Sequence, residues 1–364
     1  MSIFNGDVVT EVRGRIGLIT LNRPRALNAL SLGMVRDLTV ALQAWAQDPA
    51  VLAVAIRGSN KEGVFGAFCA GGDIRFLHQA GTTADPDLEA FFTEEYALNH
   101  LIHAYPKPYI AFMDGIVMGG GMGISQGASV RVVTERTKMA MPETHIGLFP
   151  DVGGGFFLSR CPGKLGEYLG LTGLMLSGPQ AVAAKLADMA LPSAMLETIW
   201  DKLGNSPFEN SEAVERFVLA QPSSLAPEKL QPQPQIDAVF GMPTVQAMLD
   251  TLEAASDDWS QHTAKTLRAR SPLMLNVVLE QIRRARSMGL AEDLRMERDM
   301  VHHCFHLRSV HDSDTVEGIR ALAVDKDHSP KWKPAKVEDV DAAEVARFFV
   351  SPWPSDHHPL RHLA

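Results

Sequence analysis

The sequence predicts an α/β protein whose C-terminal half is mainly helical. In the first 150 residues, short runs rich in β-branched residues alternate with segments whose apolar residues recur at helical spacing. Beyond about Pro150 the strand signals fade and the helical spacing continues. Because helical crossovers separate the successive strands, we expect a largely parallel sheet in the N-terminal half.

The elements can be read in chain order. Val8–Arg13 and Ile16–Leu21 are rich in β-branched residues and separated by Gly14, which predicts a hairpin. Ser31 is the predicted cap of a helix that reaches Trp45. The pattern then continues with a strand at 51–56, a helix at 88–103, a strand at 108–113, a short helix after the glycine triplet 119–121 and a strand at 130–134.

The second half shows helical spacing in four stretches, at 165–171, 178–187, 194–203 and 273–288. The proline-rich stretch 221–234 has the composition of a linker, so it marks either a boundary or a long surface loop. Three prolines among the last 14 residues predict a weakly ordered tail at 351–364.

Composition narrows the classes of function. The chain has 364 residues, of which 46% are hydrophobic, and a formal net charge of −9 without a block of Lys or Arg. This charge argues against a nucleic-acid partner and against an anionic membrane surface. No apolar run approaches the roughly 18 to 20 residues that cross a bilayer, so no membrane association is expected.

The cysteines and the N-terminus bear on the compartment. Cys69, Cys161 and Cys304 are odd in number and lack paired spacing, which fits a reducing compartment better than a disulfide framework. The first residues show neither a basic and apolar leader nor an Arg-rich amphipathic helix. We therefore expect cytoplasmic residence.

Two glycine-rich turns each lead into a predicted helix. One is Ala70-Gly71-Gly72-Asp73, and the other is Gly119-Gly120-Gly121. Gly72 and Gly120 leave their N–H groups unobstructed by a side chain, so both are predicted hydrogen-bond donors to an oxyanion. Either turn alone is also explained as a plain tight turn.

Carboxylates form the second part of the predicted site. Glu143 stands in an apolar stretch, which would raise its pKa and suit it to act as a base or nucleophile. A glutamate favoured at a helix start is the alternative. Asp151 precedes Val152 and three glycines, where on its own a helix cap is the better interpretation.

Two other patterns are weaker. Ser125 fits a G-x-S-x-G motif, but it would lie inside a helix instead of on the strand-to-helix turn that exposes a nucleophile. His302 and His306 have the spacing of a metal pair, yet His303 replaces the Glu of H-E-x-x-H. No metal site is predicted, and the glycine runs do not fit a dinucleotide fingerprint.

These motifs resemble the crotonase (enoyl-CoA hydratase/isomerase) superfamily, and within it the 3-hydroxyisobutyryl-CoA hydrolases. The similarity extends over nearly the whole chain. It is carried by Asn22-Arg23-Pro24, Asn28-Ala29-Leu30, Phe68-Cys69-Ala70-Gly71-Gly72-Asp73-Ile74-Arg75, Glu94-Glu95-Tyr96, Asp114-Gly115, Met118-Gly119-Gly120-Gly121, Met141-Pro142-Glu143-Thr144, Ile146 to Gly155 and Asp325 to Trp332.

The resemblance implies a ββα spiral core that binds acyl-CoA and catalyses, at 1–205, and a helical C-terminal region at 206–364. It places the oxyanion hole for a CoA-thioester carbonyl at Gly72 and Gly120, and it matches Glu143 to the catalytic glutamate. Many members of the superfamily form trimers or hexamers, so a homo-oligomer is compatible with it.

Further roles are implied position by position. Asp151 matches a second acidic residue of the hydrolases, and Glu95 matches a substrate-binding glutamate. Gly123 stands where hydratases carry the first of their two glutamates, and its lack of a carboxylate disfavours hydration. Arg25 and Ala70 are predicted contacts of the CoA portion, although a solvated surface role also explains Arg25.

The activity implied is hydrolysis of a short 3-hydroxyacyl-CoA thioester, foremost 3-hydroxyisobutyryl-CoA in valine catabolism. Glu143 would either form a mixed anhydride or activate water. No cofactor is expected, because CoA is part of the substrate and a product. An enoyl-CoA hydratase or isomerase and a non-catalytic acyl-CoA-binding protein are the alternatives.

Overall fold

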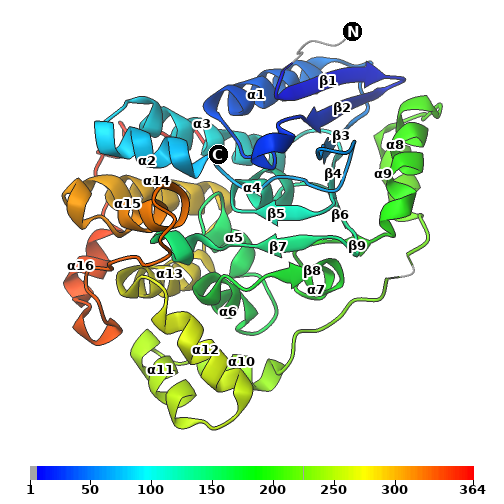
Figure 1. The fold of residues 1–364 in the computed structure, drawn as a ribbon. Helices are drawn as coiled ribbons and strands as arrows, with labels where there is room; N and C mark the ends of the chain where they lie inside the picture. Colours follow the sequence, from blue (N-terminus) through cyan, green and yellow to red (C-terminus); the bar gives the residue numbers. More distant parts are fainter. Residues whose placement is uncertain (1–5, 224) are drawn as a thin grey trace. The chain divides into compact units, whose positions relative to one another are not determined.

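The computed structural model describes residues 6–223 and 225–364. Figure 1 labels its helices and strands. The chain forms two compact units and alternates between them along its length. The first unit consists of Met1–Gly72, Ala97–Met139 and Met175–Leu230. The second unit consists of Asp73–Tyr96, Ala140–Leu174 and Gln231–Ala364. The boundary expected between residues 205 and 206 stays a prediction.

A six-stranded sheet is the centre of the first unit. Its strand order is β1-β2-β3-β4-β6-β9, in which only β1 and β2 pair antiparallel and the other neighbours are parallel. The predicted hairpin and parallel crossovers are thereby confirmed. The strands are β1 (Val8–Arg13), β2 (Ile16–Leu21), β3 (Ala53–Gly58), β4 (Tyr109–Met113), β6 (Val130–Val133) and β9 (Met189–Ala190).

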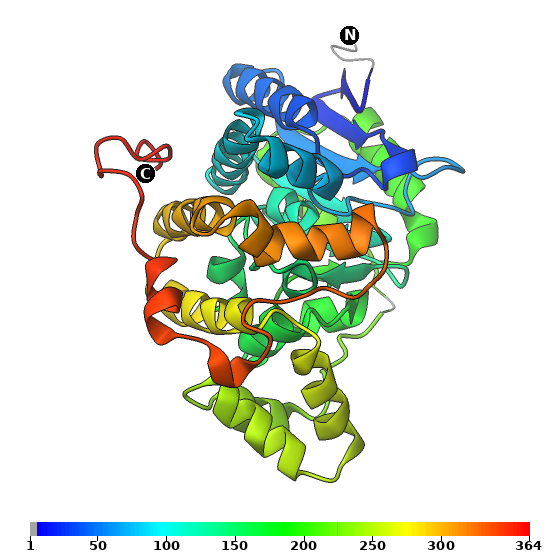
Figure 2. The same cartoon turned by 60° about the vertical axis from the view of Figure 1, so that its left-hand side comes forward.

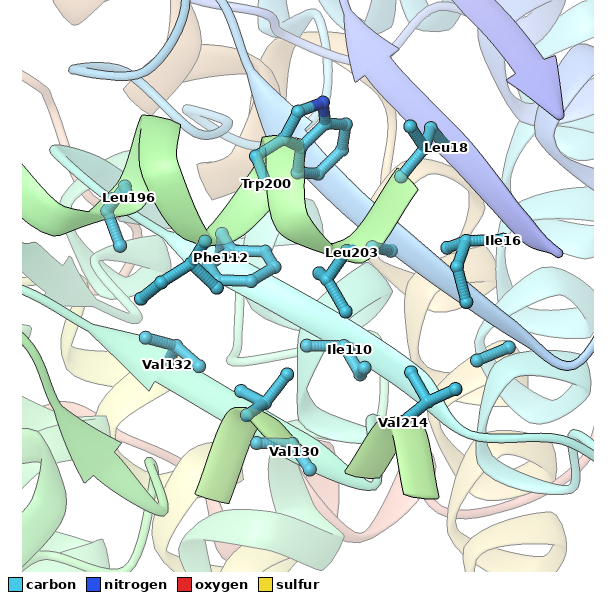
Figure 3. Close-up of a cluster of buried hydrophobic side chains, with 14 of the residues drawn as sticks. Ile16, Leu18, Ile110, Phe112, Val130, Val132, Leu196, Trp200, Leu203 and Val214 are labelled. Carbon is cyan, nitrogen blue, oxygen red and sulfur yellow. The ribbon is translucent and has the colours of Figure 1, made fainter. Parts of the chain in front are cut away.

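The helices of the first unit pack on this sheet. Ser31 caps α1 (Leu32–Gln47) as predicted, because its side chain accepts a hydrogen bond from Met34 N. Helices α8 (Leu196–Asn205) and α9 (Ser211–Leu219) contribute side chains to one hydrophobic core with β2, β4 and β6 (Figure 3). Trp200 lies fully buried in it, edge to face with Phe112.

A small second sheet, missed by the sequence analysis, belongs mainly to the first unit. Its order is β5-β7-β8. The strands have only two or three residues each, too few for an alternating pattern to be visible in the sequence. They are β5 (Ile116–Met118), β7 (Lys138–Ala140) and β8 (Leu176–Ser177), with α4 (Gly120–Gln126) after β5 and α7 (Gly178–Ala183) after β8.

The second unit is built mainly from helices, which confirms the predicted helical C-terminal half. Among the described residues after Ala190, every regular element is helical. Helices α10, α11 and α12 gather into one group in both views (Figures 1 and 2). The helices are α2 (Ile74–Thr83), α3 (Asp87–His103, continuing into the first unit), α5 (Gly154–Leu158), α6 (Leu165–Thr172), α10 (Gln233–Phe240), α11 (Val245–Ala254), α12 (Asp258–Arg268), α13 (Pro272–Ala285), α14 (Leu290–His306), α15 (Asp314–Ile319) and α16 (Ala342–Arg347).

The C-terminal segment 351–364 is packed, so the prediction of a weakly ordered tail was wrong. The Trp353 ring lies 4.8 Å from the ring of His302, centroid to centroid, and Leu360 is fully buried. Arg295 donates a hydrogen bond to the carbonyl of Leu363 at 2.9 Å. The prolines limit the backbone but leave these apolar side chains free to pack against α14. Within the described residues, no helix is long and apolar enough to span a membrane.

Candidate active site

The two glycine turns lie side by side in the first unit. Cys69 and Val117 form a parallel bridge, in which Met118 N donates to the Cys69 carbonyl at 3.0 Å. Three residues further along, the paired segments reach Gly72 and Gly120. A Cβ placed on Gly71 would lie 3.5 Å from the Gly120 nitrogen, which shows how closely the turns approach.

Both predicted donors have available N–H groups. In the part of the chain that the structure describes, neither Gly72 N nor Gly120 N donates to a backbone carbonyl. Gly120 is the first residue of α4, where the N–H group has no acceptor inside the helix. Gly71, with φ +105°, and Gly119, with φ +48°, adopt turns that favour glycine. The arrangement can offer two N–H groups to one oxygen atom.

Close packing behind the turns depends on particular side chains. A Cβ on Gly121 would lie 2.3 Å from the Cys69 carbonyl oxygen, so this position requires glycine. The buried Asn28 side chain donates to the carbonyls of Ala67 and Phe68 at 3.0 and 3.1 Å. The motif containing Asn28 therefore holds the segment that leads to the first turn.

The predicted CoA contacts lie in the same unit as the glycine turns. Arg25 is exposed on the short helix η1 (Pro24–Ala26). Ala70 N donates to the Leu27 carbonyl at 3.0 Å, which places the segment of Ala70 against the turn that follows Arg25. Whether either residue contacts CoA stays a prediction.

The three predicted carboxyl groups belong to the second unit, and all are buried. Glu95 lies on α3, Glu143 begins the short helix η2 (Glu143–Ile146), and Asp151 precedes α5. Their exposed fractions are 2%, 7% and 6%. The hydroxyl of Tyr96 donates to Asp151 Oδ2 at 2.9 Å. The structure thus forms a carboxyl cluster with a tyrosine on one of its members.

Burial and mutual repulsion control the charge of this cluster. Burial raises the pKa of Glu143 well above its usual value, and the negative charge of Asp151 raises it further. Burial and Asp151 do the same to Glu95. Burial raises the pKa of Asp151 to about 6, against the lowering effect of the Tyr96 hydrogen bond. Asp151 can therefore exchange a proton at about pH 6, and Glu143 and Glu95 hold their protons to higher pH than exposed glutamates do.

Two oxygens in the cluster lack partners. Glu95 Oε1 and Glu143 Oε2 are buried without a hydrogen bond to any residue that the structure describes. A buried polar atom without a partner is costly in free energy, and such atoms are found where a ligand binds. The pair of unsatisfied oxygens is consistent with a substrate site.

Comparison with known proteins agrees with this geometry. The family model for enoyl-CoA hydratase/isomerase matches residues 16–349. The chain belongs to this family. It is 40% identical over 351 residues to the mitochondrial 3-hydroxyisobutyryl-CoA hydrolase of Danio rerio, covering 95% of this chain and 90% of that protein. The human protein of the same name is 38% identical over 359 residues, at 96% and 90% coverage.

Solved structures of the family share the fold. A carnitinyl-CoA dehydratase from Mycobacterium thermoresistibile matches with a TM-score of 0.84 and 38% identity, over 96% of this chain and 98% of that one. An enoyl-CoA hydratase from Rhodobacter sphaeroides matches with a TM-score of 0.86 and 37% identity, over 95% and 98%. The predicted crotonase-like α/β fold with a helical C-terminal region is confirmed.

The serine of the G-x-S-x-G pattern is not placed as a nucleophile in the structure. Ser125 is fully buried inside α4, and its hydroxyl donates to the Gly121 carbonyl at 2.8 Å. This bond within the helix uses the hydroxyl proton. The prediction that Ser125 is not a nucleophile agrees with this placement.

Glu89, His302 and His306 could hold a metal ion, since their ligand atoms all lie within 4.8 Å of one another. The two imidazoles lie 3.2 and 2.8 Å from the same Glu89 oxygen, and Arg298 contacts the other oxygen. Burial raises the pKa of Glu89, but the histidines and Arg298 together lower it below its usual value. A guanidinium beside the carboxylate opposes a second cation, so we interpret the group as an ion-pair cluster. The absence of a metal stays a prediction.

Sequence reasoning missed three residues near the carboxyl cluster. Tyr96 lies in the motif Glu94-Glu95-Tyr96, but the sequence alone predicted no role for it. Asp293 and Glu297 of α14 are buried and bind the backbone that follows Asp151. Their signal was present, because acids at positions shared with Leu294, Met300 and Val301 on the buried face of a helix are unusual.

Proposed function

We propose that this protein hydrolyses the thioester of 3-hydroxyisobutyryl-CoA to 3-hydroxyisobutyrate and CoA, a step of valine catabolism. The observation that carries the proposal is the buried Glu143 carboxyl beside Asp151, whose charge raises the pKa of Glu143. A carboxylate of raised pKa is a stronger base and nucleophile than an exposed one. The names of the curated relatives support the choice of substrate.

In the proposed reaction, Gly72 and Gly120 donate their N–H groups to the thioester carbonyl oxygen. The charge on this oxygen grows as the tetrahedral intermediate forms, so the donors stabilise the transition state more than the substrate. In comparable acyl-transfer sites, one such donor contributes about 3 to 4 kcal/mol. The available N–H groups of both glycines support this role.

Glu143 has two possible routes. As a nucleophile, its carboxylate attacks the carbonyl carbon, the C–S bond breaks, CoA leaves as a thiolate, and water then hydrolyses the mixed anhydride. As a general base, it takes a proton from the water that attacks directly. Asp151 and Glu95 are proposed to bind the 3-hydroxyl group of the substrate, where their raised pKa values suit hydrogen bonding as donor or acceptor.

Hydration of an enoyl-CoA is the second candidate, because a solved relative is named an enoyl-CoA hydratase. Gly123 weighs against it. This residue lies buried in α4 and offers no side chain where hydratases of the family carry a glutamate. The carboxyls of Glu143 and Asp151 likewise weigh against a protein that only binds acyl-CoA.

The deciding experiment follows free-thiol release from 3-hydroxyisobutyryl-CoA with a thiol reagent and measures crotonyl-CoA hydration in parallel. We expect thiol release without hydration. Glu143→Gln should reduce thiol release by at least about a thousandfold, since a group that acts on the reacting carbon is removed. Hydration without thiol release, or parental thiol release by Glu143→Gln, would overturn the proposal.

The place of this reaction in the cell is also a proposal. No disulfide joins the three cysteines, which are all buried, and this supports a reducing compartment such as the cytoplasm. The relatives are named as mitochondrial, so fractionation of the source cells with compartment markers is the test. Assembly as a homo-oligomer is proposed from the family alone and can be measured by light scattering.

A further inference from the structure

Two buried carboxyl groups of α14 hold the start of α5. Glu297 accepts hydrogen bonds from Gly153 N at 2.7 Å and from Gly155 N at 2.9 Å. Asp293 accepts from Phe156 N at 2.8 Å. These N–H groups lie at the N-terminus of α5, where no helix carbonyl can accept them. The helix start is therefore capped by side chains more than 130 residues away in sequence.

The same network reaches the backbone on the other side of Asp151. Gln281 of α13 donates to the Pro150 carbonyl at 2.6 Å and to Glu297 Oε1 at 2.9 Å. Pro150 and Gly153 flank Asp151 and Val152. Glu297 thus connects, directly or through Gln281, to both ends of the short segment that carries Asp151.

This segment has a backbone conformation that needs support. Val152 has φ +56°, in the left-handed region that β-branched residues rarely adopt. Such conformations persist where the surrounding structure holds them, and they cluster at functional sites. The side chain of Val152 is buried, so the support for this backbone conformation comes from the surrounding protein.

Burying two acids costs more free energy than capping a helix requires. Asp293 and Glu297 are fully buried, and burial raises the pKa of Asp293 to about 6. Burial, and then the charge of Asp293, raise the pKa of Glu297 as well, and Asp151 adds to this. A serine or asparagine would cap a helix without a buried acid. Buried acids in positions where a neutral side chain would serve are expected at functional sites.

We propose that Glu297 and Asp293 are positioning residues for the hydrolysis. They hold the backbone around Asp151 so that its carboxyl keeps the hydrogen bond from the Tyr96 hydroxyl. The inference rests on the proposed function. Neither residue touches the substrate in this scheme, because both act through the N–H groups that follow Asp151.

A double-mutant cycle with thiol release as readout tests the proposal. Glu297→Gln places an NH₂ group where one backbone N–H needs an acceptor. We expect kcat to fall about 10- to 100-fold, and KM to rise as well, because Asp151 is proposed to bind the 3-hydroxyl group of the substrate. In the Asp151→Asn background the same change should cost less than about twofold, because residues that act through one group are not additive. Asp293→Asn should behave alike.

Glu280→Gln is the matched control, since Glu280 is a half-exposed glutamate of the neighbouring helix α13 and pairs only with Arg284 among the described residues. It should leave kcat unchanged. Circular dichroism checks the fold of each variant, and Glu297→Asp, which keeps the carboxyl on a shorter side chain, replaces Glu297→Gln if the latter does not fold.

The outcomes separate the two proposals. An unchanged kcat in Glu297→Gln, or an equal loss in both backgrounds, overturns the positioning role while thioester hydrolysis stands. Parental turnover by Asp151→Asn also overturns the positioning role, since the group through which it acts would be dispensable. Absence of thiol release from the unmodified protein contradicts the proposed function itself.

Discussion

At the scale of residues, Asp151 acts on three of its neighbours. Its charge raises the pKa of Glu143 and of Glu95, and it accepts the hydrogen bond of Tyr96. No Lys or Arg side chain among the described residues forms an ion pair with these three carboxyls. Burial first, and then repulsion within the cluster, therefore raise the pH at which Glu143 becomes ionised.

This gives a prediction about pH dependence. Glu143 must be ionised to act as base or nucleophile, so activity is lost as the pH falls through its pKa. Asp151→Asn removes a charge that raises this pKa, and the acidic limb of kcat/KM for the residual activity should move to lower pH. Glu280→Gln should leave the limb in place. A limb that stays or moves upward in Asp151→Asn would show that Asp151 does not control Glu143.

The candidate site residues that could be predicted from the sequence are those whose signals are local. Gly72 and Gly120 were found because consecutive glycines at a turn are visible over four residues, and Glu143 because it stands in an apolar stretch. Glu297 was not found, since its partners are the N–H groups of Gly153 and Gly155, which only folding brings to it.

At the scale of elements, the paired segments that end in Gly72 and Gly120 matter most. Cys69 and Val117 set their register, and the close approach at Gly121 leaves no space between them. A periodicity argument could predict the strands and the helix α4 but not this pairing, because an isolated bridge has no repeating pattern.

A matched pair of glycine substitutions tests this contact. Gly121→Ala places a Cβ 2.3 Å from the Cys69 carbonyl oxygen, so we expect a loss of about 1 to 3 kcal/mol in the free energy of unfolding and a lower kcat. Gly33→Ala is the control, because a Cβ on Gly33 in α1 meets only Ser31 Oγ, at 3.8 Å. It should be neutral or stabilise by up to about 1 kcal/mol. Urea unfolding and thiol release measure both effects, and equal behaviour of the two variants would contradict the tight contact.

At the scale of the whole molecule, the sequence predicted the parallel sheet and the helical second half. It did not predict that the chain alternates between two units, because that depends on contacts between segments far apart in sequence. The chain passes for the last time from the first unit to the second between Leu230 and Gln231, within the proline-rich stretch 221–234. The second unit contains the buried acids, so its stability should depend on pH.

Glu143→Gln should make the protein more stable in alkaline conditions. The folded-state pKa of Glu143 is raised above about 4.5, the usual value, so its contribution to stability is full below that pH and is lost as the pH rises through the raised pKa. The variant lacks this loss. Between the two pKa values its advantage in free energy of unfolding should grow by about 1.4 kcal/mol per pH unit. Chemical unfolding at pH 5 and pH 8 measures it, and a pH-independent difference would contradict the buried ionisation.

The alternation of the chain between units also has a consequence during synthesis. A ribosome releases Glu95, Glu143 and Asp151 well before α14, whose Glu297 and Asp293 hold the segment after Asp151. Until α14 emerges, the N–H groups at the start of α5 lack these side-chain acceptors and must be satisfied by water. The nascent chain therefore cannot hold the backbone around Asp151 early, and a polypeptide truncated before Asp293 should be inactive even where its sheet has folded.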